Sequence, residues 1–406
     1  MISFFNRSPI LLIIIALVLH MLSASALADE ASCDGEHMLL LEEHNENITC
    51  AILIDDELIF PRNIKARDNQ IWLIDKGSNL FVNEKHNGAL YRYEKSNDGY
   101  QRTQILSDLD DPNDIDIRQH ADGEDWVYFT TRDKVQRFKA SSPDTELETI
   151  IDDLSTHGWH KLVAIHLTQN ALYLTVPSTT DHCEIEGLQG LVELPCREEE
   201  NGTALMREYS FDGDELSPDY KVVAQGLRDA LAVQISPDNT QLIVADNGWD
   251  QVDLRDTGYE YDSTPYDEIN IIDLSEEEHF GWPYCFDDGL VVPPYRDFLD
   301  SCDEYQTPDI LLQAHSAPLN MMYFDNELLI NLHGNNQAGG KTAAFEIDEE
   351  GLPLGMSGVK INWHYNSSSN SPVIGRPFGL SETLNNELLV TDDWNHQLLK
   401  IVFETD

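Results

Sequence analysis

Basic residues are scarce in this sequence: 25 Lys and Arg stand against 74 Asp and Glu, which gives a formal net charge of −49 at pH 7. Such a charge repels nucleic acids and anionic lipid surfaces, so we exclude both as partners. Apolar residues make up 41% of the chain, which is enough for a hydrophobic core, and disorder is not indicated. The few Lys and Arg within turn motifs are informative, because they depart from the acidic trend.

Long hydrophobic runs are also rare, and the main one extends from Ile10 to Met21. Arg7 precedes this run and Ala26-Leu27-Ala28 follows it, a pattern typical of a secretory signal peptide over residues 1–28. The run is short for a membrane span, which makes an uncleaved anchor the weaker alternative. We therefore expect cleavage near Ala28, a mature chain without membrane insertion, and a periplasmic or secreted location.

Cys-x-x-Cys spacings are absent, which argues against a zinc cluster. All six cysteines follow the predicted signal peptide, and an even number in an exported chain favours disulfides. Proximity in the sequence suggests three local pairs, although other connectivities remain open: Cys33 with Cys50, Cys183 with Cys196, and Cys285 with Cys302.

Helical periodicity is almost absent, and a different unit recurs instead. Each unit opens on a turn, as in Pro61-Arg62-Asn63-Ile64, and continues with a short apolar strand, as in Ile71-Trp72-Leu73-Ile74-Asp75. Strands of this second kind are expected at 71–75, 126–130, 171–176, 241–245, 327–332 and 387–391. Six units at a spacing of roughly 50 to 90 residues predict an all-β fold, a six-bladed β-propeller with four-stranded antiparallel blades around a central channel.

The predicted propeller domain covers residues 51–406, and residues 29–50 form a disulfide-tied lead-in before it. Two long inserts interrupt the repeat, at 178–203 and 247–267, and we expect them to cover the mouth of the channel. Propellers support many unrelated functions, so the repeat alone does not identify one.

Residues with metal-binding chemistry gather in the segment from Gly226 to Cys285. A buried strand at 241–245 delivers Asp246-Asn247-Gly248-Trp249-Asp250 into a turn, and Asp267-Glu268 follows an acidic loop. The carboxylates of Asp246, Asp250, Asp267 and Glu268 are hard oxygen ligands, which suit calcium better than zinc or copper. The sequence therefore suggests a calcium site here, although acidic clusters are common in so acidic a chain.

The order of the motifs resembles that of the glucose/sorbosone dehydrogenase family, soluble quinoproteins that bind pyrroloquinoline quinone (PQQ). The resemblance rests on Gly226-Leu227-Arg228, Asp246-Asn247-Gly248, Gly281-Trp282-Pro283-Tyr284-Cys285, His315-Ser316-Ala317-Pro318-Leu319 and Gly375-Arg376-Pro377. Three positions depart from the family pattern: Asp229 replaces an Asn, Trp249 an Arg and Tyr266 a Pro. The resemblance implies an exported dehydrogenase that oxidises a hydroxyl of an aldose or related sugar with PQQ and calcium.

The resemblance also implies roles for particular residues. His157 takes the place of the base that removes the proton from the sugar hydroxyl, and His160 lies beside the cofactor. Arg228 would stabilise the oxyanion at the reactive quinone carbonyl, where Asp229 would also touch the quinone. Cofactor contacts are further expected from Lys341 and Arg376, which would hold carboxylates, and from His315, which would line the channel. For Arg228 the alternative is a structural salt bridge with a loop Asp, and for the histidines a loop hydrogen bond or a strand cap.

Two other classes of function stay open at this point. One is a non-catalytic propeller that binds a carbohydrate or a protein, because the departure at Asp229 places an anion beside a tricarboxylate cofactor. The other is a calcium-dependent lactonase-type hydrolase. The sequence identifies neither the sugar nor the electron acceptor.

Overall fold

The computed structural model of the chain describes residues 41, 45, 47–77, 87–97, 99–143, 147–154, 158–185, 191–249, 264–334, 337–364 and 373–403. These residues form strands, turns and loops, with a short 3-10 helix, η3 (Pro293–Tyr295). The predicted signal peptide and Cys33 lie outside the described residues. None of the helical segments in the described ranges is long and apolar enough to cross a membrane.

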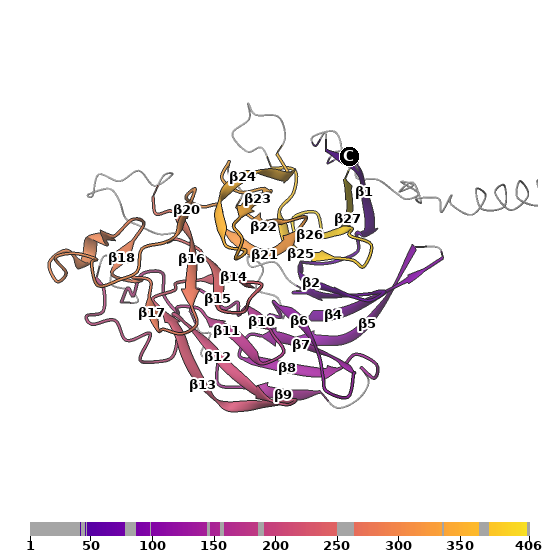
Figure 1. Cartoon of the computed structure of the whole chain (residues 1–406), viewed down its shortest axis with the longest axis horizontal. Helices are drawn as coiled ribbons and strands as arrows, with labels where there is room; N and C mark the ends of the chain where they lie inside the picture. The colour runs from indigo at the N-terminus through magenta and orange to yellow at the C-terminus, as the bar shows by residue number, and fades with distance from the viewer. Residues whose placement is uncertain are drawn as a thin grey trace, which may run out of the picture. The chain divides into compact units, whose positions relative to one another are not determined.

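Six main sheets follow one another along the chain as the blades of a propeller (Figure 1). Blade 1 consists of β2 (Pro61–Arg67), β3 (Gln70–Asp75), β4 (Gly88–Ser96) and β5 (Gly99–Leu109). Blade 2 consists of β6 (Ile115–Gln119), β7 (Asp125–Thr131), β8 (Lys134–Lys139) and β9 (Glu148–Ile151). Blade 3 consists of β10 (Ile165–Leu167), β11 (Ala171–Val176), β12 (Leu205–Asp212), β13 (Glu215–Gln225) and a short fifth strand, β17 (Glu278–His279).

The second half of the chain completes the set. Blade 4 consists of β14 (Ala230–Ile235), β15 (Gln241–Asp246), β16 (Asp267–Asp273) and β20 (Ile310–Leu312). Blade 5 consists of β21 (Pro318–Phe324), β22 (Glu327–Leu332), β23 (Lys341–Ile347) and β24 (Pro353–Asn362). Blade 6 consists of β25 (Pro377–Glu382), β26 (Leu388–Asp392), β27 (Gln397–Phe403) and β1 (Ile48–Asp55). A separate hairpin joins β18 (Cys285–Phe286) and β19 (Leu290–Val291).

The first strand of each blade, here called the inner strand, belongs to a closed ring. Contacts link β2 to β6, β6 to β10, β10 to β14, β14 to β21, β21 to β25 and β25 back to β2. This arrangement confirms the predicted six-bladed propeller and its central channel.

The two ends of the described chain meet in blade 6. There β1 pairs antiparallel with β27, so the first strand in the sequence is the outermost strand of the last blade. The sequence-based boundary between lead-in and propeller, at residue 51, falls inside this strand. Pairing the two ends covers a strand edge and holds blade 6 to both ends of the chain.

The second strand of each blade is the most buried. All six residues of β11 are buried, and in β3 and β15 five of the six. Such a strand has sheet neighbours on both sides and other blades against both faces, which explains why its sequence is a continuous apolar run. The second strands lie at the predicted positions. The prediction of four strands per blade holds for five blades, whereas in blade 3 the strand β17 adds parallel to β13.

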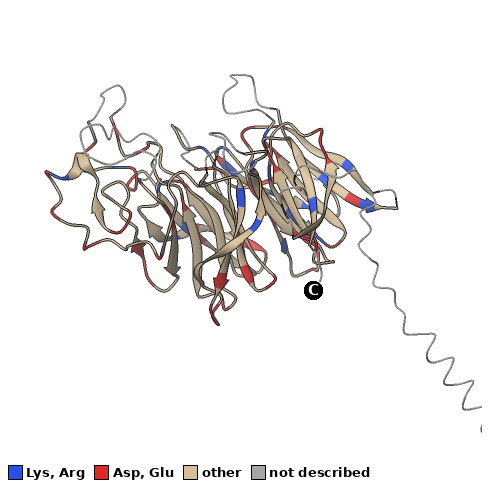
Figure 2. Cartoon of the chain, turned by 90° about the horizontal axis from the view of Figure 1, so that it is seen from above, with Lys and Arg blue, Asp and Glu red and all other residues tan. Residues whose placement is uncertain are grey.

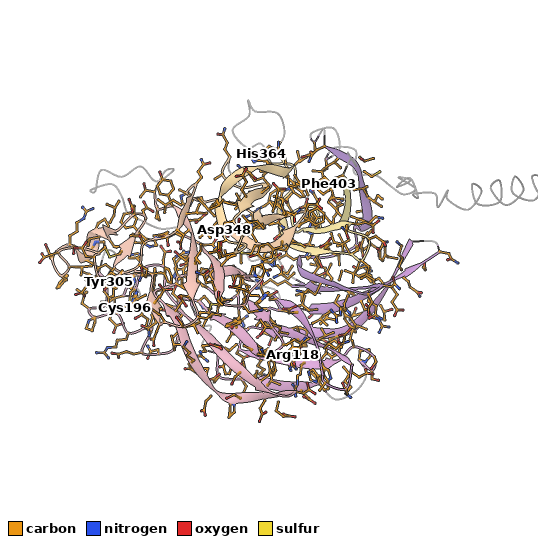
Figure 3. All side chains as sticks on the ribbon, in the orientation of Figure 1. Arg118, Cys196, Tyr305, Asp348, His364 and Phe403 are labelled. Carbon is orange, nitrogen blue, oxygen red and sulfur yellow. A yellow bond between two sulfur atoms is a disulfide. The ribbon has the colours of Figure 1, made fainter. Side chains whose placement is uncertain are left out.

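Polar side chains connect neighbouring inner strands. Asn63 Nδ2 donates to Asp114 Oδ1 at 2.6 Å, between blades 1 and 2. Ser381 Oγ accepts the backbone N–H of Ala66 at 2.8 Å, between blades 6 and 1. Further out, Arg118 of β6, labelled in Figure 3, donates to the carbonyl of Gln169 at 2.9 Å, between blades 2 and 3. Because each of these hydrogen bonds joins one blade to the next, they fix the blades' positions around the channel.

Candidate active site

One face of the propeller collects the loops that could carry chemistry, and we call it the loop face. In each blade the inner and second strands are antiparallel, so the start of the first lies beside the end of the second. Pro61 thus pairs with Asp75, Pro318 with Leu332 and Pro377 with Asp392. Residues before an inner strand or after a second strand therefore meet at the same end of the channel.

Four basic residues gather on the loop face, and we call them the cation cluster: Arg62, Lys76, Lys161 and Arg376. Arg62 interacts electrostatically with both Arg376 and Lys76, and Lys76 with Lys161. Figure 2 shows acidic residues on many loops and strand ends, which makes a concentration of cations notable in a chain with 25 Lys and Arg. The carboxylates of Asp111 and Asp393 offset part of the positive charge.

Arg62 is the most enclosed member of the cation cluster. Its side chain is 2% exposed, and its guanidinium lies between the rings of Phe60 and Phe378, at 4.4 and 4.3 Å from their centroids. Nη1 lies 3.4 Å from Asp393 Oδ2, but the buried Nε and Nη2 have no hydrogen-bond partner within the described residues. Burial lowers the pKa of Arg62 to about 10, so it is still charged at neutral pH. Buried donors without partners are costly, and a ligand carboxylate would satisfy them.

Arg376 is held in place by a chain of hydrogen bonds. Its Nε donates to the carbonyl of His333 at 2.9 Å, and its Nη2 donates to His333 Nδ1 at 2.7 Å. On the other side of the ring, His333 Nε2 donates to the carboxylate of Asp393 at 2.8 and 2.9 Å. Burial lowers the pKa of His333. Both ring nitrogens of this neutral imidazole are engaged, so His333 positions Arg376 and is not available as a base.

Lys76 is the second buried cation. It directly follows β3, its side chain is 2% exposed, and its Nζ lies 3.5 Å from Asp111 Oδ1. Burial lowers its pKa to about 8, and the nearby Arg62 acts in the same direction. Asp111 has a second cationic partner in Arg132. The surroundings of Lys76 therefore disfavour its charged form, as expected of a buried lysine that binds a negatively charged ligand.

Arg228, the predicted oxyanion partner, lies in a buried ion pair. Its Nη2 is 2.5 Å from Asp181 Oδ1, and its Nη1 donates to the carbonyl of Asn247 at 3.0 Å. Both side chains of the ion pair are 3% exposed. The structural salt bridge that the sequence left as an alternative is thus present. Asp229 immediately precedes β14, and its backbone N–H donates to Asp246 Oδ1 at 2.6 Å.

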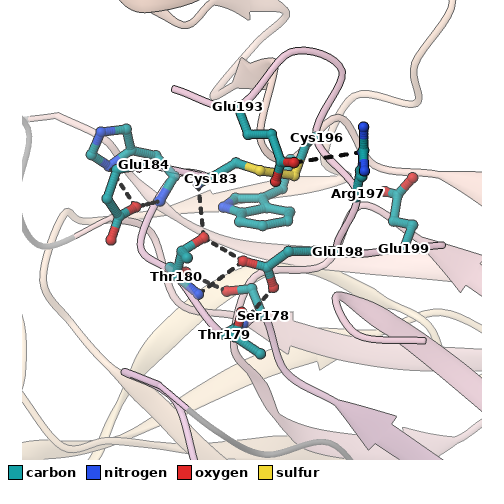
Figure 4. The surroundings of a disulfide bond; sticks show 12 residues. Ser178, Thr179, Thr180, Cys183, Glu184, Glu193, Cys196, Arg197, Glu198 and Glu199 are labelled. Atoms are coloured by element: carbon teal, nitrogen blue, oxygen red, sulfur yellow. Dashed lines mark hydrogen bonds and ion pairs between the residues drawn. A yellow bond between two sulfur atoms is a disulfide. The ribbon is translucent and has the colours of Figure 1, made fainter. Parts of the chain in front are cut away.

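The insert at 178–203 supplies Asp181, and a disulfide and several hydrogen bonds stabilise this insert. The predicted disulfide joins Cys183 and Cys196, which are 13 residues apart (Figure 4). The buried carboxylate of Glu198 accepts the backbone N–H groups of Thr179 and Thr180, and the hydroxyl of Thr203 at 3.1 Å. Cys285 and Cys302 form the second predicted disulfide. The Cys183–Cys196 disulfide and the hydrogen bonds of Glu198 fix the loop that carries the partner of Arg228.

We expect Glu198→Gln to lower the free energy of unfolding by about 1–2 kcal/mol. The amide has one oxygen acceptor in place of two, and its NH₂ group would face the N–H donors that the carboxylate now accepts. Chemical denaturation of the variant and the parent, with both disulfides intact, measures the difference. Glu193→Gln is the matched control, because Glu193 lies in the same insert and only makes an exposed ion pair with Arg197. Equal losses in both variants would contradict the assigned role.

His160, predicted to lie beside the cofactor, is in the same neighbourhood. Its Nδ1 lies 2.9 Å from the carbonyl of Ser178, and a carbonyl only accepts, so Nδ1 carries the hydrogen. Nε2 therefore has the free lone pair. Burial lowers the pKa of His160 to about 3, and Arg228 acts in the same direction. The imidazole stays neutral across the physiological range. His157, the predicted base, lies outside the described residues.

The predicted calcium ligands have other partners. Asp246 Oδ1 and Oδ2 accept the backbone N–H groups of Asp229 and Arg228, at 2.6 and 2.7 Å. Asp267 Oδ2 accepts the hydroxyl of Ser316 and the N–H of Ala317, both at 2.7 Å. The same role falls to Asp75 and Asp392, which end the second strands of blades 1 and 6 and accept backbone N–H groups of the loop face.

Glu268 lies near Asp246 and Asp287, and burial raises its pKa well above the usual range, with both carboxylates adding to the effect. Within the described residues no group of three or more His, Cys, Asp and Glu side chains has a metal-binding arrangement. Asp250, the remaining predicted ligand, lies outside the described residues, so the calcium site stays a prediction.

The remaining predicted site residues are not brought into the cation cluster by any described contact. Lys341 Nζ donates to the carbonyl of Gln337 in its own loop, at 3.0 Å, and burial lowers its pKa. His315 is half-buried with a φ of 61°, and it interacts electrostatically with Asp267. Of the predicted cofactor contacts, Arg376 alone is a described member of the cation cluster.

Comparison with known proteins gives the same fold. A family model described as TrAA12-like matches residues 49–289, more than half of the chain. An uncharacterized protein of Borreliella burgdorferi is 22% identical over 380 residues, which cover 87% of this chain and 88% of that protein.

Two solved structures share the fold. The holo form of the pyranose dehydrogenase PQQ domain from Coprinopsis cinerea is 18% identical, covers 86% of this chain and 94% of its own, and has a TM-score of 0.65. A calcium structure of a Trichoderma reesei carbohydrate-active enzyme of family AA12 is 17% identical, covers 87% of this chain and 95% of its own, and has a TM-score of 0.66. The resemblance to soluble PQQ-dependent sugar dehydrogenases is confirmed, and the chain belongs to the TrAA12-like family.

Proposed function

We propose that the protein is an exported PQQ-dependent dehydrogenase that oxidises a hydroxyl of an aldose or related sugar. The observation that carries the proposal is the buried guanidinium of Arg62, whose Nε and Nη2 have no hydrogen-bond partner within the described residues. Three further cations accompany it, in a chain that is otherwise strongly acidic. PQQ carries three carboxylates, and planar guanidinium groups with a lysine are the side chains that match them.

The cation cluster would hold the cofactor. Arg62 and Arg376 present fixed guanidinium planes, the first through stacking on Phe60 and Phe378 and the second through His333. Lys76 and Lys161 add positive charge. A lysine ammonium group, unlike a guanidinium, does not require a bidentate arrangement with the carboxylate. When bound, PQQ supplies a two-electron acceptor for the hydrogen on the sugar carbon. We propose that Arg228 acts on the quinone through its charge and not by a hydrogen bond, because Asp181 and Asn247 accept its described hydrogen bonds.

A proton must leave the sugar hydroxyl, and the histidine loop before β10 is the source of a base. We propose His157 as that base. His160 supports the assignment of this loop to the site, since its Nε2 lone pair is free while Nδ1–H is held by Ser178. With a pKa of about 3, His160 is too weak a base for the main role and instead accepts a hydrogen bond.

Two exposed tryptophans support a sugar as the substrate. Trp159, which is 60% exposed, directly precedes His160, and Trp394, which is 59% exposed, directly follows Asp393. Both indoles therefore lie on the loop face, next in sequence to residues of the site. An exposed aromatic face beside polar groups is suited to the apolar face of a sugar ring.

The proposed use of calcium rests on similar proteins, because one solved structure with this fold is described as a calcium structure. We assign no calcium ligand among the described residues, because the oxygens of Asp246 and Asp267 accept backbone N–H groups.

Titration calorimetry of PQQ into the purified protein, with calcium and then with a chelator, tests the proposal. We expect saturable binding, and a loss of about 10- to 100-fold in affinity for Arg62→Ala, which removes charge-assisted hydrogen bonds to a carboxylate. Arg102→Ala is the matched control in the same blade, because Arg102 belongs to the outermost strand β5 and pairs with Asp55 and Glu57, which are not members of the cation cluster. No binding with or without calcium would refute the dehydrogenase and leave a binding propeller.

A further inference from the structure

A cavity lies on the channel axis, and no member of the cation cluster lines it. It has a volume of about 220 Å³, and its wall takes residues from the inner strands of all six blades. The cation cluster adjoins the starts of the inner strands, whereas this cavity is lined by later residues such as Lys65, Gln234 and Glu382. It therefore opens towards the end of the channel opposite the loop face, and we call it the distal cavity.

Several hydrogen-bonding groups in the wall of the distal cavity have no hydrogen-bond partner within the described residues. Asn63 is 2% exposed and lines the cavity, and its buried Oδ1 has no hydrogen-bond partner within the described residues. The imidazole of His166 and the carboxylate of Glu382 also line the cavity without a hydrogen bond to another described residue. Burial lowers the pKa of His166 to about 4, so the neutral ring offers one donor and one acceptor. A buried acceptor without a partner is costly and indicates a ligand or water.

The wall of the distal cavity carries more negative than positive charge, because the carboxyl groups of Asp114, Asp116 and Glu382 line it together with the ammonium group of Lys65. Lys65 Nζ lies 2.7 Å from Asp116 Oδ1, and the lysine side chain is 40% exposed while the carboxylate is 6% exposed. Burial acts to lower the pKa of Lys65, but Asp116 outweighs it and the pKa is raised, which keeps the pair ionised. Glu382 adds a further negative charge. An anion is disfavoured by the three acidic side chains, and a strong cation near Asp116 is disfavoured by the ammonium group of Lys65 that already pairs with it.

The rest of the wall combines amides with apolar surface. Gln234 and Asn320 bring side-chain amides from blades 4 and 5, and Leu231, Val233 and Met321 bring apolar surface. The volume is below the roughly 300–1,000 Å³ of pockets for drug-sized ligands, so the occupant is a small molecule. Neutral donors, neutral acceptors, one ion pair and apolar patches are the features that recognise a compact neutral molecule with many hydroxyl groups.

We propose that the distal cavity binds a neutral polyol or monosaccharide, as a site separate from the loop face. Lys65, His166 and Gln234 donate to its hydroxyl oxygens, and Asn63 Oδ1 and Glu382 accept from its hydroxyl groups. The apolar residues contact its C–H groups. The site does not depend on PQQ, because no member of the cation cluster lines the distal cavity.

Equilibrium dialysis of radiolabelled glucose against the protein without PQQ tests the proposal. We expect saturable binding in the millimolar range, weakened about tenfold by Gln234→Leu and by Glu382→Met, each of which removes one neutral or charge-assisted hydrogen bond. Gln241→Leu is the matched control for the first variant, since Gln241 lies in blade 4 outside the cavity. Thermal unfolding confirms that each variant is folded.

Each outcome of the dialysis either supports the distal cavity as the sugar site or overturns the proposal. Loss of binding in Gln234→Leu and Glu382→Met, with unchanged binding in Gln241→Leu and Arg376→Ala, supports the distal cavity as the sugar site. Loss in Arg376→Ala alone would place the bound sugar on the loop face and overturn the proposal. Absence of saturable binding would also overturn it. The dialysis results are independent of the affinity for PQQ, which the calorimetric titration measures.

Discussion

Replacing His157 with alanine is expected to lower kcat for dye-coupled sugar oxidation by about 10²- to 10⁴-fold. The reason is that oxidation of a hydroxyl group requires its proton to be taken up, and alanine cannot accept it. PQQ affinity is expected to stay within about threefold of the parent, because the cation cluster that holds the cofactor is unchanged. Steady-state kinetics with an artificial electron acceptor, alongside the PQQ titration, measures both quantities.

His160→Gln is the matched comparison for His157→Ala. Glutamine retains a donor for the Ser178 carbonyl but has no basic nitrogen. We expect a smaller loss, about tenfold or less in kcat, because the pKa of about 3 makes His160 a poor base. Unchanged turnover in His157→Ala together with a loss of 10²-fold or more in His160→Gln would transfer the role of base to His160. Unchanged turnover in both would exclude this loop from the chemistry.

The fold could be predicted from the sequence because its strongest signal is local. Each second strand is buried on both faces, so it appears as an apolar run that needs no knowledge of its partners. The strand β1 was less visible, since its partner β27 is at the opposite end of the chain and the predicted domain boundary cut through it. The strand β17 has two residues, which is too short to produce any pattern.

The site was harder to predict, because its key residues are single members of repeated turns. Asp246 was assigned to calcium from its neighbourhood in the sequence, yet it ends a second strand as Asp75 and Asp392 do, and all three accept backbone N–H groups. Comparison of the repeats with each other could have revealed this shared role. The partner of Arg228 could not be predicted, because Asp181 lies 47 residues earlier, in the disulfide-tied insert.

Arg62 and Lys76 were also missed as site residues, although the sequence contained a clue. Both stand at the loop-face ends of blade 1 strands, in a chain where acidic residues outnumber basic ones by 74 to 25. A buried cation is costly unless it is paired, and two buried donors of Arg62 have no hydrogen-bond partner within the described residues. A residue that costs stability and is nevertheless present is a candidate for function, and the cost itself can be measured.

Lys76→Met is expected to stabilise the protein and to weaken PQQ binding at the same time. The lysine is 2% exposed, and a pKa of about 8 in place of 10.5 corresponds to a cost of up to about 3 kcal/mol at pH 7. Methionine fills similar space without a charge, and Asp111 keeps Arg132 as its partner. Affinity for PQQ is expected to fall about 10- to 100-fold, because one cation near its carboxylates is lost.

The dependence on pH separates this account from a simple packing effect. Because the folded state holds Lys76 with a lowered pKa, the unfolded chain binds more protons between pH 8 and 10.5, and the stability of the parent rises over that interval. The advantage of Lys76→Met in unfolding free energy should thus be largest below pH 8 and disappear by pH 10.5, as measured by chemical denaturation at each pH. Lys95→Met, at an exposed position of β4, is the control and should show no such trend. If the difference in unfolding free energy between Lys76→Met and the parent does not change with pH, the pKa of Lys76 is not lowered in the folded state. That result would remove the energetic argument for placing a carboxylate ligand beside Lys76.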